Sequence, residues 1–306
     1  MKQPIRREPV QRLMENLSQT VVGKQSAIQL VLSALLSGGH VLLEDVPGVG
    51  KTLLAKSLSR SIGGLFKRVQ CTPDLLPADI TGTNIWNPRT GQFEFLAGPA
   101  LTNILLADEI NRATPRTQSA LLEVMEEHQV TIDGVSHPVP RPFFVIATQN
   151  PIEYQGTFPL PEAQMDRFAI SLNLGYPSQD EELTLLQQLN QRQSAPMEPC
   201  ISLQEVTQLQ MAAQQVHLEG HLQTYVLALV RATREREDVR LGVSPRGGIA
   251  LYRATQAFAF LEGRDYATPD DVKRLAPHVL AHRLIPDAGQ TGPQVVADLL
   301  QSVPVP

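Results

Sequence analysis

Short strand-like runs alternate with stretches of helical periodicity from Val10 to about Tyr176. This alternation is typical of strand and helix units that build a mostly parallel sheet covered by helices. The pattern in this first part of the chain therefore predicts an α/β domain. Its four expected strands are His40–Leu43, Lys67–Gln70, Ile104–Ala107 and Phe143–Thr148.

The pattern changes at the breaker Gly175–Ser178, after which the strand-like runs stop and helical periodicity continues. We expect residues 1–176 to form the α/β domain and residues 177–306 to form an all-α domain. The expected helices are Gln179–Gln193, Leu203–His217, Leu222–Glu235, Arg246–Leu261, Asp270–His282 and a short one near Gln294–Leu300.

Two segments interrupt the α/β pattern. Asn84–Leu96 (NIWNPRTGQFEFL) and Gln129–Val139 (QVTIDGVSHPV) each hold two short strand-like runs. The turn signals Arg89–Gly91 and Asp133–Gly134 separate the runs. We expect both segments to form β-hairpins inserted into the α/β domain.

A glycine-containing loop joins the first expected strand to the next helix. The stretch Glu44–Thr52 has the sequence EDVPGVGKT, with Gly48 and Gly50 just before Lys51 and Thr52. Glycines let the backbone approach phosphate oxygens, and the helix start adds aligned N–H donors. We expect Lys51 to bind the β- and γ-phosphates of a nucleoside triphosphate and the Thr52 hydroxyl to ligate Mg²⁺. A plain strand-to-helix turn with an incidental lysine is the alternative.

Asp45 departs from the usual form of this loop, G-x-x-x-x-G-K-[ST], which has glycine at that position. A carboxylate beside phosphates is unfavourable unless it turns outward or binds the loop's own amides, and Pro47 can stiffen the turn in compensation. The loop residues expected to contact the nucleotide are Asp45, Val46, Pro47, Gly48, Val49, Gly50, Lys51 and Thr52.

Two acidic residues, Asp108 and Glu109, follow the expected strand Ile104–Ala107. Because ligands bind at the carboxyl edge of a parallel sheet, we expect both beside the phosphate loop. We assign Asp108 to the Mg²⁺ shell, directly or through water, and Glu109 to polarising the attacking water. A pair that only caps a turn is the alternative. Asn150 follows another strand at this edge, where its amide can orient the water; the alternative is a simple Asn-Pro turn.

Arg246 lies in the first turn of an expected helix, after the N-cap residue Ser244 and Pro245. The helix dipole disfavours a cation there by about 0.3–1 kcal/mol, so we expect an anion outside the helix to compensate. A triphosphate held against the helical domain would do so, and a solvated arginine is the alternative.

Arg167 is expected to act in trans, reaching the γ-phosphate bound by the next subunit. Its sequence neighbour Asp166 would not face it on a helix, so no local ion pair is implied. An ordinary surface arginine is the alternative. Arg112 and Arg116 are rival candidates for the trans role.

Val21–Lys24 precedes the apolar helical stretch Ile28–Leu36 near the N-terminus. We expect an apolar patch with exposed backbone at Val22 and Gly23 to hold the adenine. A loop that only packs against the helix is the alternative.

The composition limits the classes of function. A net charge of −5 over 306 residues argues against a nucleic-acid binder, although a local basic stripe can hide in an acidic total. The chain has no apolar run of about 20 residues and no secretory signal, so we expect a cytoplasmic protein. Cys71 and Cys200 lie far apart without metal-ligand spacing, which predicts packed thiols rather than a disulfide or a zinc site.

With these residues in view, the chain resembles the MoxR family of AAA+ ATPases over nearly its whole length. The stretches that carry the resemblance are VVGKQSAI, LLEDVPGVGKTLLAKSL, LLADEINRATPRTQSALLEVMEEHQVTIDG, VIATQNPIEYQGTFPLPEAQMDRF and GVSPRG. The resemblance implies a P-loop AAA+ core with a mostly parallel sheet and two inserted hairpins, followed by an all-α lid. The Asp-Val-Pro variant of the phosphate loop is familiar in this family.

The resemblance also implies a role for each candidate residue. Asn84–Leu96 would be the helix-two insert and Gln129–Val139 the hairpin before sensor one. The aromatic residues Trp86, Phe93 and Phe95 would contact a client or pack within the hairpins. The implied roles are Walker A for Lys51 and Thr52, Walker B for Asp108 and Glu109, sensor one for Asn150, the arginine finger for Arg167 and sensor two for Arg246.

Members of this family bind ATP and Mg²⁺, form homo-oligomeric rings, usually hexamers, and act as chaperones with proteins that carry von Willebrand A domains. The resemblance therefore implies an ATPase that remodels or matures a protein partner. Two alternatives stay open. One is a nucleotide-controlled binding scaffold with little turnover, and the other is a DNA-acting or chelatase-type AAA+ relative.

Overall fold

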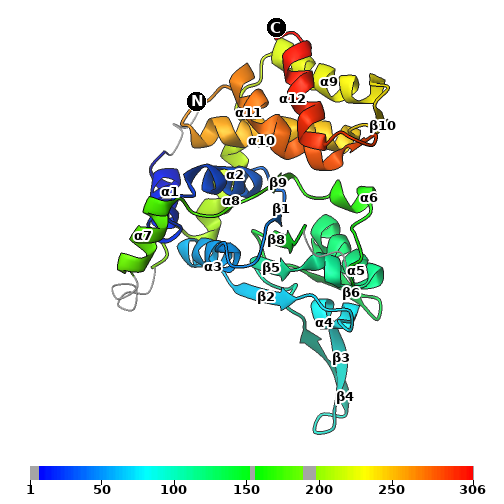
Figure 1. The fold of residues 1–306 in the computed structure, drawn as a ribbon. Coiled ribbons are helices and arrows are strands. Elements are labelled where there is room, and N and C mark those ends of the chain that lie inside the picture. The colour runs from blue at the N-terminus through cyan, green and yellow to red at the C-terminus, as the bar shows by residue number, and fades with distance from the viewer. Residues whose placement is uncertain (1–6, 152–155, 189–197, 306) are drawn as a thin grey trace.

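The computed structural model describes residues 7–151, 156–188 and 198–305 (Figure 1). At its centre lies a five-stranded sheet in the order β2-β5-β8-β1-β9, in which every neighbouring pair is parallel. The four predicted strands are confirmed within one or two residues. The strands are β1 (Val41–Glu44), β2 (Phe66–Gln70), β5 (Ile104–Asp108), β8 (Phe144–Gln149) and β9 (Ile170–Leu172).

The edge strand β9 was not predicted, because three residues are too few to show a strand pattern. Side chains alternate between the two faces of the sheet. Leu43 and Leu106 pack into a cluster with the N-terminal helices, whereas Leu42 and Leu105 pack into a second cluster with α5. The helices of this region are α1 (Arg7–Thr20), α2 (Gln25–Leu36), α3 (Lys51–Ser61), α4 (Pro77–Thr81), η1 (Ile110–Arg112), α5 (Pro115–Glu127) and α6 (Glu162–Met165).

Both predicted hairpins are present. They are β3–β4 (Gly82–Asn87 and Gln92–Ala97) and β6–β7 (Gln129–Ile132 and Val135–Pro138). The Phe95 ring stacks on His137 of the second hairpin at 3.9 Å between ring centroids. Trp86 and Phe93 instead pair with each other on the first hairpin and are 55% and 69% exposed. Figure 1 shows this hairpin projecting from the body of the protein.

The C-terminal region is helical, as predicted, with one correction. A short antiparallel pair, β10 (Val239–Leu241) and β11 (Ile285–Pro286), lies where no strand was expected. These strands are too short to show a period of two in the sequence. The expected helix Gln179–Gln193 extends in its last part beyond the described residues. The helices are α7 (Gln179–Gln188), α8 (Leu203–Ala213), α9 (Gly220–Glu235), α10 (Pro245–Leu261), α11 (Pro269–Leu280), η2 (Ala281–Arg283) and α12 (Gly292–Ser302).

Helix α2 packs between the sheet and the C-terminal helices, and Figure 1 shows it beside α10. Nine of its residues are buried, which explains why its sequence is apolar on nearly every side. One hydrophobic cluster therefore runs from α1 and α2 into α10 and α11. None of the helices in the described part of the chain is both long enough and apolar enough to cross a membrane.

His40 stands immediately before β1 and joins three elements. Val145 N–H donates to its Nδ1 at 3.1 Å, so Nε2 carries the ring hydrogen and donates to the Met125 carbonyl oxygen at 3.2 Å. Burial lowers the pKa of His40 from 6.5 to about 4, against the opposite effect of the Met125 bond, and the nearby His128 lowers it further. The folded protein therefore holds the ring in its neutral form.

We expect the free energy of unfolding to fall as the pH drops from 6.5 towards 4. In this window the unfolded chain binds a proton at His40 that the folded chain does not, which costs up to about 1.4 kcal/mol per pH unit. Urea unfolding should depend less on pH in His40→Gln than in the native chain. His221→Gln, at an exposed position of α9, is the control and should keep the native slope. Equal slopes in all three proteins would contradict this role of His40.

Candidate functional site

The phosphate loop joins β1 to α3. Gly48 and Gly50 have φ angles of +89° and +98°, which L side chains rarely adopt, so both turns favour glycine. Helix α3 begins at Lys51, directly after Gly50, so its first N–H groups face the loop. The buried Lys51 ammonium donates to the carbonyl oxygen of Asp45 at 2.8 Å. The loop therefore has the backbone geometry of an anion-binding site, and the Lys51 ammonium group contacts the loop backbone.

The Asp45 carboxylate is bound by backbone N–H groups that were not predicted from the sequence. The carboxylate is buried and accepts the backbone N–H groups of Leu174 and Gly175, the latter at 3.1 Å. These N–H groups belong to the segment that follows β9 and not to the loop itself. Two backbone N–H donors therefore stabilise the charge of Asp45, and the loop is tied to the segment that leads from β9 to α7.

Asp108 is the last residue of β5 and is buried at the same sheet edge as the loop. The Thr148 hydroxyl donates to Asp108 Oδ1 at 2.6 Å, and Arg68 Nη2 donates to Oδ2 at 2.6 Å. Since both carboxylate oxygens have protein partners, Asp108 suits a metal shell through water better than direct ligation. Thr52, in the first turn of α3, adds a hydroxyl oxygen. This donor set fits Mg²⁺, which prefers oxygen ligands and keeps several waters.

Glu109 turns its carboxylate towards polar side chains of its own chain. Its backbone has a positive φ of 55°, and its N–H donates to the Thr148 hydroxyl at 2.9 Å. Gln70 and Arg112 donate to Glu109 Oε2 at 2.7 and 3.0 Å. Positive φ in a non-glycine residue costs about 1–3 kcal/mol and is concentrated at functional sites. Arg112, a rival for the trans role, is therefore bound within its own subunit.

Three polar residues around the acidic pair were not predicted: Arg68, Gln70 and Thr148. Strand β2 pairs with β5 so that Gln70 lies opposite Asp108, and Arg68 Nη2 also donates to Gln70 Oε1 at 2.9 Å. A continuous set of hydrogen bonds therefore links both carboxylates of the acidic pair. The only signal in the sequence was that these polar residues lie in or at the ends of predicted strands.

Asn150 lies where the sequence predicted it. It follows β8 and is buried, and β8 is the strand next to β1. The preceding residue, Gln149, donates its side-chain amide to Glu44 at 2.8 Å, which ties the ends of these two strands together. Asn150 is thus beside the phosphate loop, and its role towards water and phosphate stays a prediction.

Cys71 lies next to the acidic pair but is no candidate nucleophile. Its N–H donates to the Asp108 carbonyl oxygen at 2.8 Å. Burial, together with the charges of Asp108 and Glu109, raises the pKa of the thiol to about 12. The thiol stays protonated, and both Cys71 and Cys200 are free, as predicted.

Arg167 and Arg246 meet at one carboxylate. Arg167 Nη1 lies 2.5 Å from Glu126 Oε2 and donates to the Leu122 carbonyl oxygen at 2.7 Å. Arg246 binds the other carboxylate oxygen, Glu126 Oε1. The anion beside Arg246 at the start of α10 in this structure is therefore Glu126.

The arginine pair lies at the sheet edge opposite to the phosphate loop. Helix α5 starts beside the acidic pair and runs back to the other edge, where Met125 bonds to His40 just before β1. Arg167 likewise precedes β9, which is parallel to β1. The structure thus separates the two arginines from the loop of their own chain by the length of the strands. The third candidate, Arg116, is exposed in the first turn of α5.

The expected adenine patch at Val22 and Gly23 lies against the segment that enters α7. The Glu181 side chain packs so closely on Gly23 that a Cβ there would lie 1.9 Å from its Cδ, and Lys24 Nζ donates to the Tyr176 carbonyl oxygen at 2.9 Å. The adenine contact stays a prediction, with Glu181 as its nearest polar neighbour on α7.

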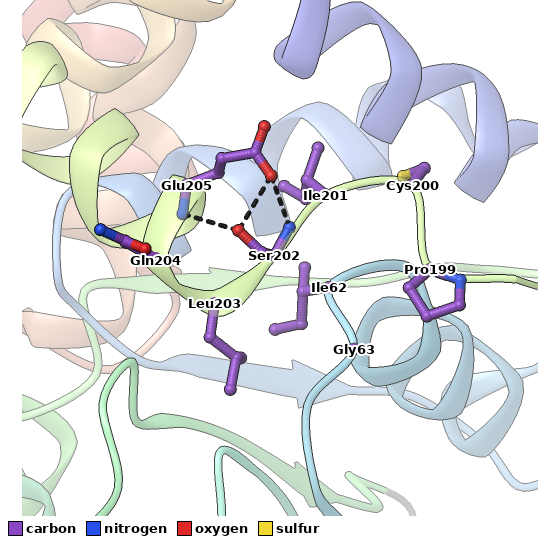
Figure 2. Close-up of a pocket in the computed structure, with 9 residues that line it drawn as sticks. All are labelled: Ile62, Gly63, Pro199, Cys200, Ile201, Ser202, Leu203, Gln204 and Glu205. Atoms are coloured by element: carbon purple, nitrogen blue, oxygen red, sulfur yellow. Dashed lines mark hydrogen bonds between the residues drawn. The ribbon is translucent and has the colours of Figure 1, made fainter.

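A separate hollow of about 600 Å³ opens at the far end of α3 (Figure 2). Ile62 and Gly63 line one side, and the turn from Pro199 to Glu205 lines the other. Ser202 and Glu205 form the N-terminal cap of α8 there: the Ser202 N–H donates to the Glu205 carboxylate, and the Glu205 N–H donates to the Ser202 hydroxyl. Helix α3 has 11 residues, so this hollow lies about 16 Å from the phosphate loop and is not the nucleotide site.

Comparison with known proteins agrees with this geometry. Residues 40–170 match the ATPase family associated with various cellular activities (AAA), and residues 231–302 match the AAA lid domain. The protein YeaC of Bacillus subtilis is 50% identical over 96% of this chain and 94% of its own length. Chaperone MoxR1 of Mycobacterium tuberculosis is 42% identical over 97% of this chain and 82% of its own length.

A third relative and a solved structure support the same family. Protein MoxR of Methylorubrum extorquens is 30% identical over 97% of this chain and 94% of its own length. The crystal structure of a candidate ATPase from Cytophaga hutchinsonii superposes with a TM-score of 0.90 at 36% identity, covering 98% of this chain and 96% of that one. With an AAA domain and an AAA lid domain matched along the chain, and relatives named MoxR at 30–42% identity over nearly its full length, the chain belongs to the MoxR family of AAA+ ATPases.

Proposed function

We propose that this protein hydrolyses ATP at a site that two neighbouring copies of the chain complete together. One observation carries the proposal: the phosphate loop and the acidic pair lie at one edge of the sheet, and Arg167 and Arg246 converge at the other. We call the edge with the phosphate loop and the acidic pair the loop edge, and the edge with Arg167 and Arg246 the arginine edge. A head-to-tail contact would bring the arginine edge of one copy to the loop edge of the next. Contacts of this kind close into rings, and we propose a hexamer.

The loop edge would bind the nucleotide and prepare the water. Lys51 and the first N–H groups of α3 would bind the phosphates, which takes Lys51 from the Asp45 carbonyl oxygen that it now contacts. Glu109 would accept a proton from the attacking water, with Asn150 orienting that water. Thr52 and Asp108 would hold Mg²⁺, which when bound neutralises charge on the β- and γ-phosphates.

The arginine edge would stabilise the charge that develops on the transferred phosphate. Glu126 already gathers two guanidinium groups around one carboxylate, which shows that they can share a single anion. When the next copy presents a γ-phosphate, Arg167 and Arg246 would exchange Glu126 for the phosphate oxygens. Preorganised cations of this kind are among the largest contributions to phosphoryl transfer.

The cycle would serve a protein partner. A relative named a chaperone, MoxR1 of Mycobacterium tuberculosis, supports this step, and we propose a partner with a von Willebrand A domain that the ring remodels or matures. The exposed Trp86–Phe93 pair on the projecting hairpin offers an apolar contact for such a partner. The net charge of −5 gives no support to the DNA-acting alternative.

Mixed assemblies test the proposal. Lys51→Ala and Arg167→Ala should each be nearly inactive alone, because one lacks the loop half of the site and the other the arginine half. An equal mixture should regain turnover at about a quarter of the interfaces, where an intact loop meets an intact arginine edge. The measurement is phosphate release from mixed oligomers verified by mass spectrometry. Verified mixtures that stay inactive would contradict a site in trans, and a native protein without turnover in assembled form would favour the scaffold alternative.

A further inference from the structure

We propose that Asp166 is a positioning residue for both arginines. Its carboxylate connects the segment that carries Arg167 to the helix start that carries Arg246, and so sets the separation of the two guanidinium groups. The inference rests on the proposed trans site and adds a residue that neither binds nucleotide nor touches the reacting atoms.

Asp166 bonds to two parts of the C-terminal helices at once. Its Oδ1 accepts from Arg283 Nε at 2.7 Å, and its Oδ2 accepts from the Ser244 hydroxyl at 2.7 Å. Ser244 is the N-cap of α10, where its Oγ also accepts the Gly247 N–H at 3.2 Å. The position of the first turn of α10, and with it Arg246, is therefore tied to Asp166.

Arg283 makes this tie rigid. Its side chain is only 2% exposed and donates to the carbonyl oxygens of Phe168 at 2.6 Å and Asp166 at 3.2 Å. The one ion pair that it forms within the described residues is with Asp166. A buried guanidinium needs such a partner, because an unpaired charge in the interior is strongly destabilising. The η2 segment is therefore docked on the residues that flank Arg167 through the Asp166 carboxylate together with the backbone carbonyls of Asp166 and Phe168.

The chain positions show why one carboxylate can serve both arginines. Asp166 directly precedes Arg167, and Ser244 stands two residues before Arg246. Glu126 attracts both guanidinium groups, which repel each other, so their separation depends on how the two backbone segments are held. An error of about 1 Å in such a group costs on the order of 100-fold in rate. Loss of Asp166 should therefore act through the arginine edge alone.

The test uses mixed assemblies of the full chain. Asp166→Ala alone should lose turnover by about 100-fold and keep the native affinity for ATP, because its own loop edge is intact. Mixed with Lys51→Ala it should regain turnover, since the Lys51→Ala copies supply sound arginine edges. Mixed with Arg167→Ala it should stay inactive, because both variants lack the same half of the site. A purely structural role would not produce this pattern of rescue.

Asp271→Ala is the matched control. The Asp271 carboxylate also binds an arginine, Arg264, at 2.6 and 2.7 Å, and it also caps a helix start through Thr268. It lies beyond the other end of α10, whose 17 residues span about 25 Å. This variant should lose stability but keep its turnover per assembled subunit. An equal loss in both variants would overturn the inference.

Two further results would also overturn it. One is native turnover in assembled Asp166→Ala, and the other is failure of Lys51→Ala to rescue Asp166→Ala under conditions where it rescues Arg167→Ala. Failure to rescue Arg167→Ala itself would instead remove the trans site on which the inference rests. If Asp166→Ala does not assemble, the isosteric Asp166→Asn takes its place, with the same expected rescue and a smaller loss of turnover. Native turnover in assembled Asp166→Asn would overturn the inference equally.

Discussion

Replacing Glu109 with glutamine should reduce ATP turnover by at least about 100-fold while leaving ATP binding close to native. The amide cannot accept the proton of the attacking water, whereas it keeps the size of the side chain and an oxygen for Gln70 and Arg112. The left-handed backbone at this position and the bond from its N–H to Thr148 do not depend on the carboxylate. Phosphate release and ATP affinity, measured on the same preparation, separate the two effects.

Glu123→Gln is the control for this experiment. It makes the same chemical change at an exposed position of α5, in the same domain, and should keep native turnover. If Glu109→Gln hydrolyses ATP at the native rate, Glu109 is not the group that activates water. If Glu109→Gln loses ATP binding as well, its contacts with Gln70 and Arg112 matter more for the shape of the site than for proton transfer.

The α/β framework could be predicted because its strands are long enough to show their pattern. Ile104–Asp108 and Phe144–Gln149 are continuous apolar runs that end in polar residues, and each was recognised. The edge strand Ile170–Leu172 and the pair β10–β11 are only two or three residues long, so their pairing is set by tertiary contacts and leaves no periodicity in the sequence. The partners of Asp45 could not be predicted for the same reason, because they follow the strand that was missed.

The loop half of the site could be located because parallel strands end at a common edge. That rule placed Lys51, Asp108 and Asn150 together without any knowledge of strand order. It could not supply Arg68 and Gln70, since which residues lie opposite the acidic pair depends on the register of β2 against β5. Register follows from packing across the whole sheet and is not visible in one segment of sequence.

The place of Arg246 in the first turn of a helix predicts a nearby anion but not which group supplies it. A cation at a helix start does require an anion, and the anion proved to be Glu126, which lies 120 residues away in the sequence. The placement of the helical region against the sheet decides this, through α2, Asp166 and Arg283. The charge and its location on the helix can be predicted from the sequence, whereas the packing of the two regions determines the partner.

The packing of the helical region against the sheet brings Arg167 and Arg246 together, and loss of Arg167 is the second large effect that we expect. Arg167→Ala should reduce ATP turnover by about 1,000-fold or more, the range found when an arginine finger is removed from phosphoryl-transfer enzymes. Arg246→Ala should also reduce it, by about 100-fold. Because both guanidinium groups converge on one anion, the double variant should be little worse than Arg167→Ala alone. Residues that act as a unit show such non-additive losses, whereas independent contributions would multiply.

The measurement is turnover per subunit at saturating ATP in all three variants, with assembly verified for each. Arg231→Ala is the control, since Arg231 is exposed on α9 and its ion pair with Glu235 is within that helix. Losses that multiply would mean that Arg246 acts at a different place from Arg167, most simply in its own subunit. If Arg116→Ala abolishes turnover and Arg167→Ala does not, the finger lies in the first turn of α5, and the pairing of Arg167 with Glu126 is a structural contact.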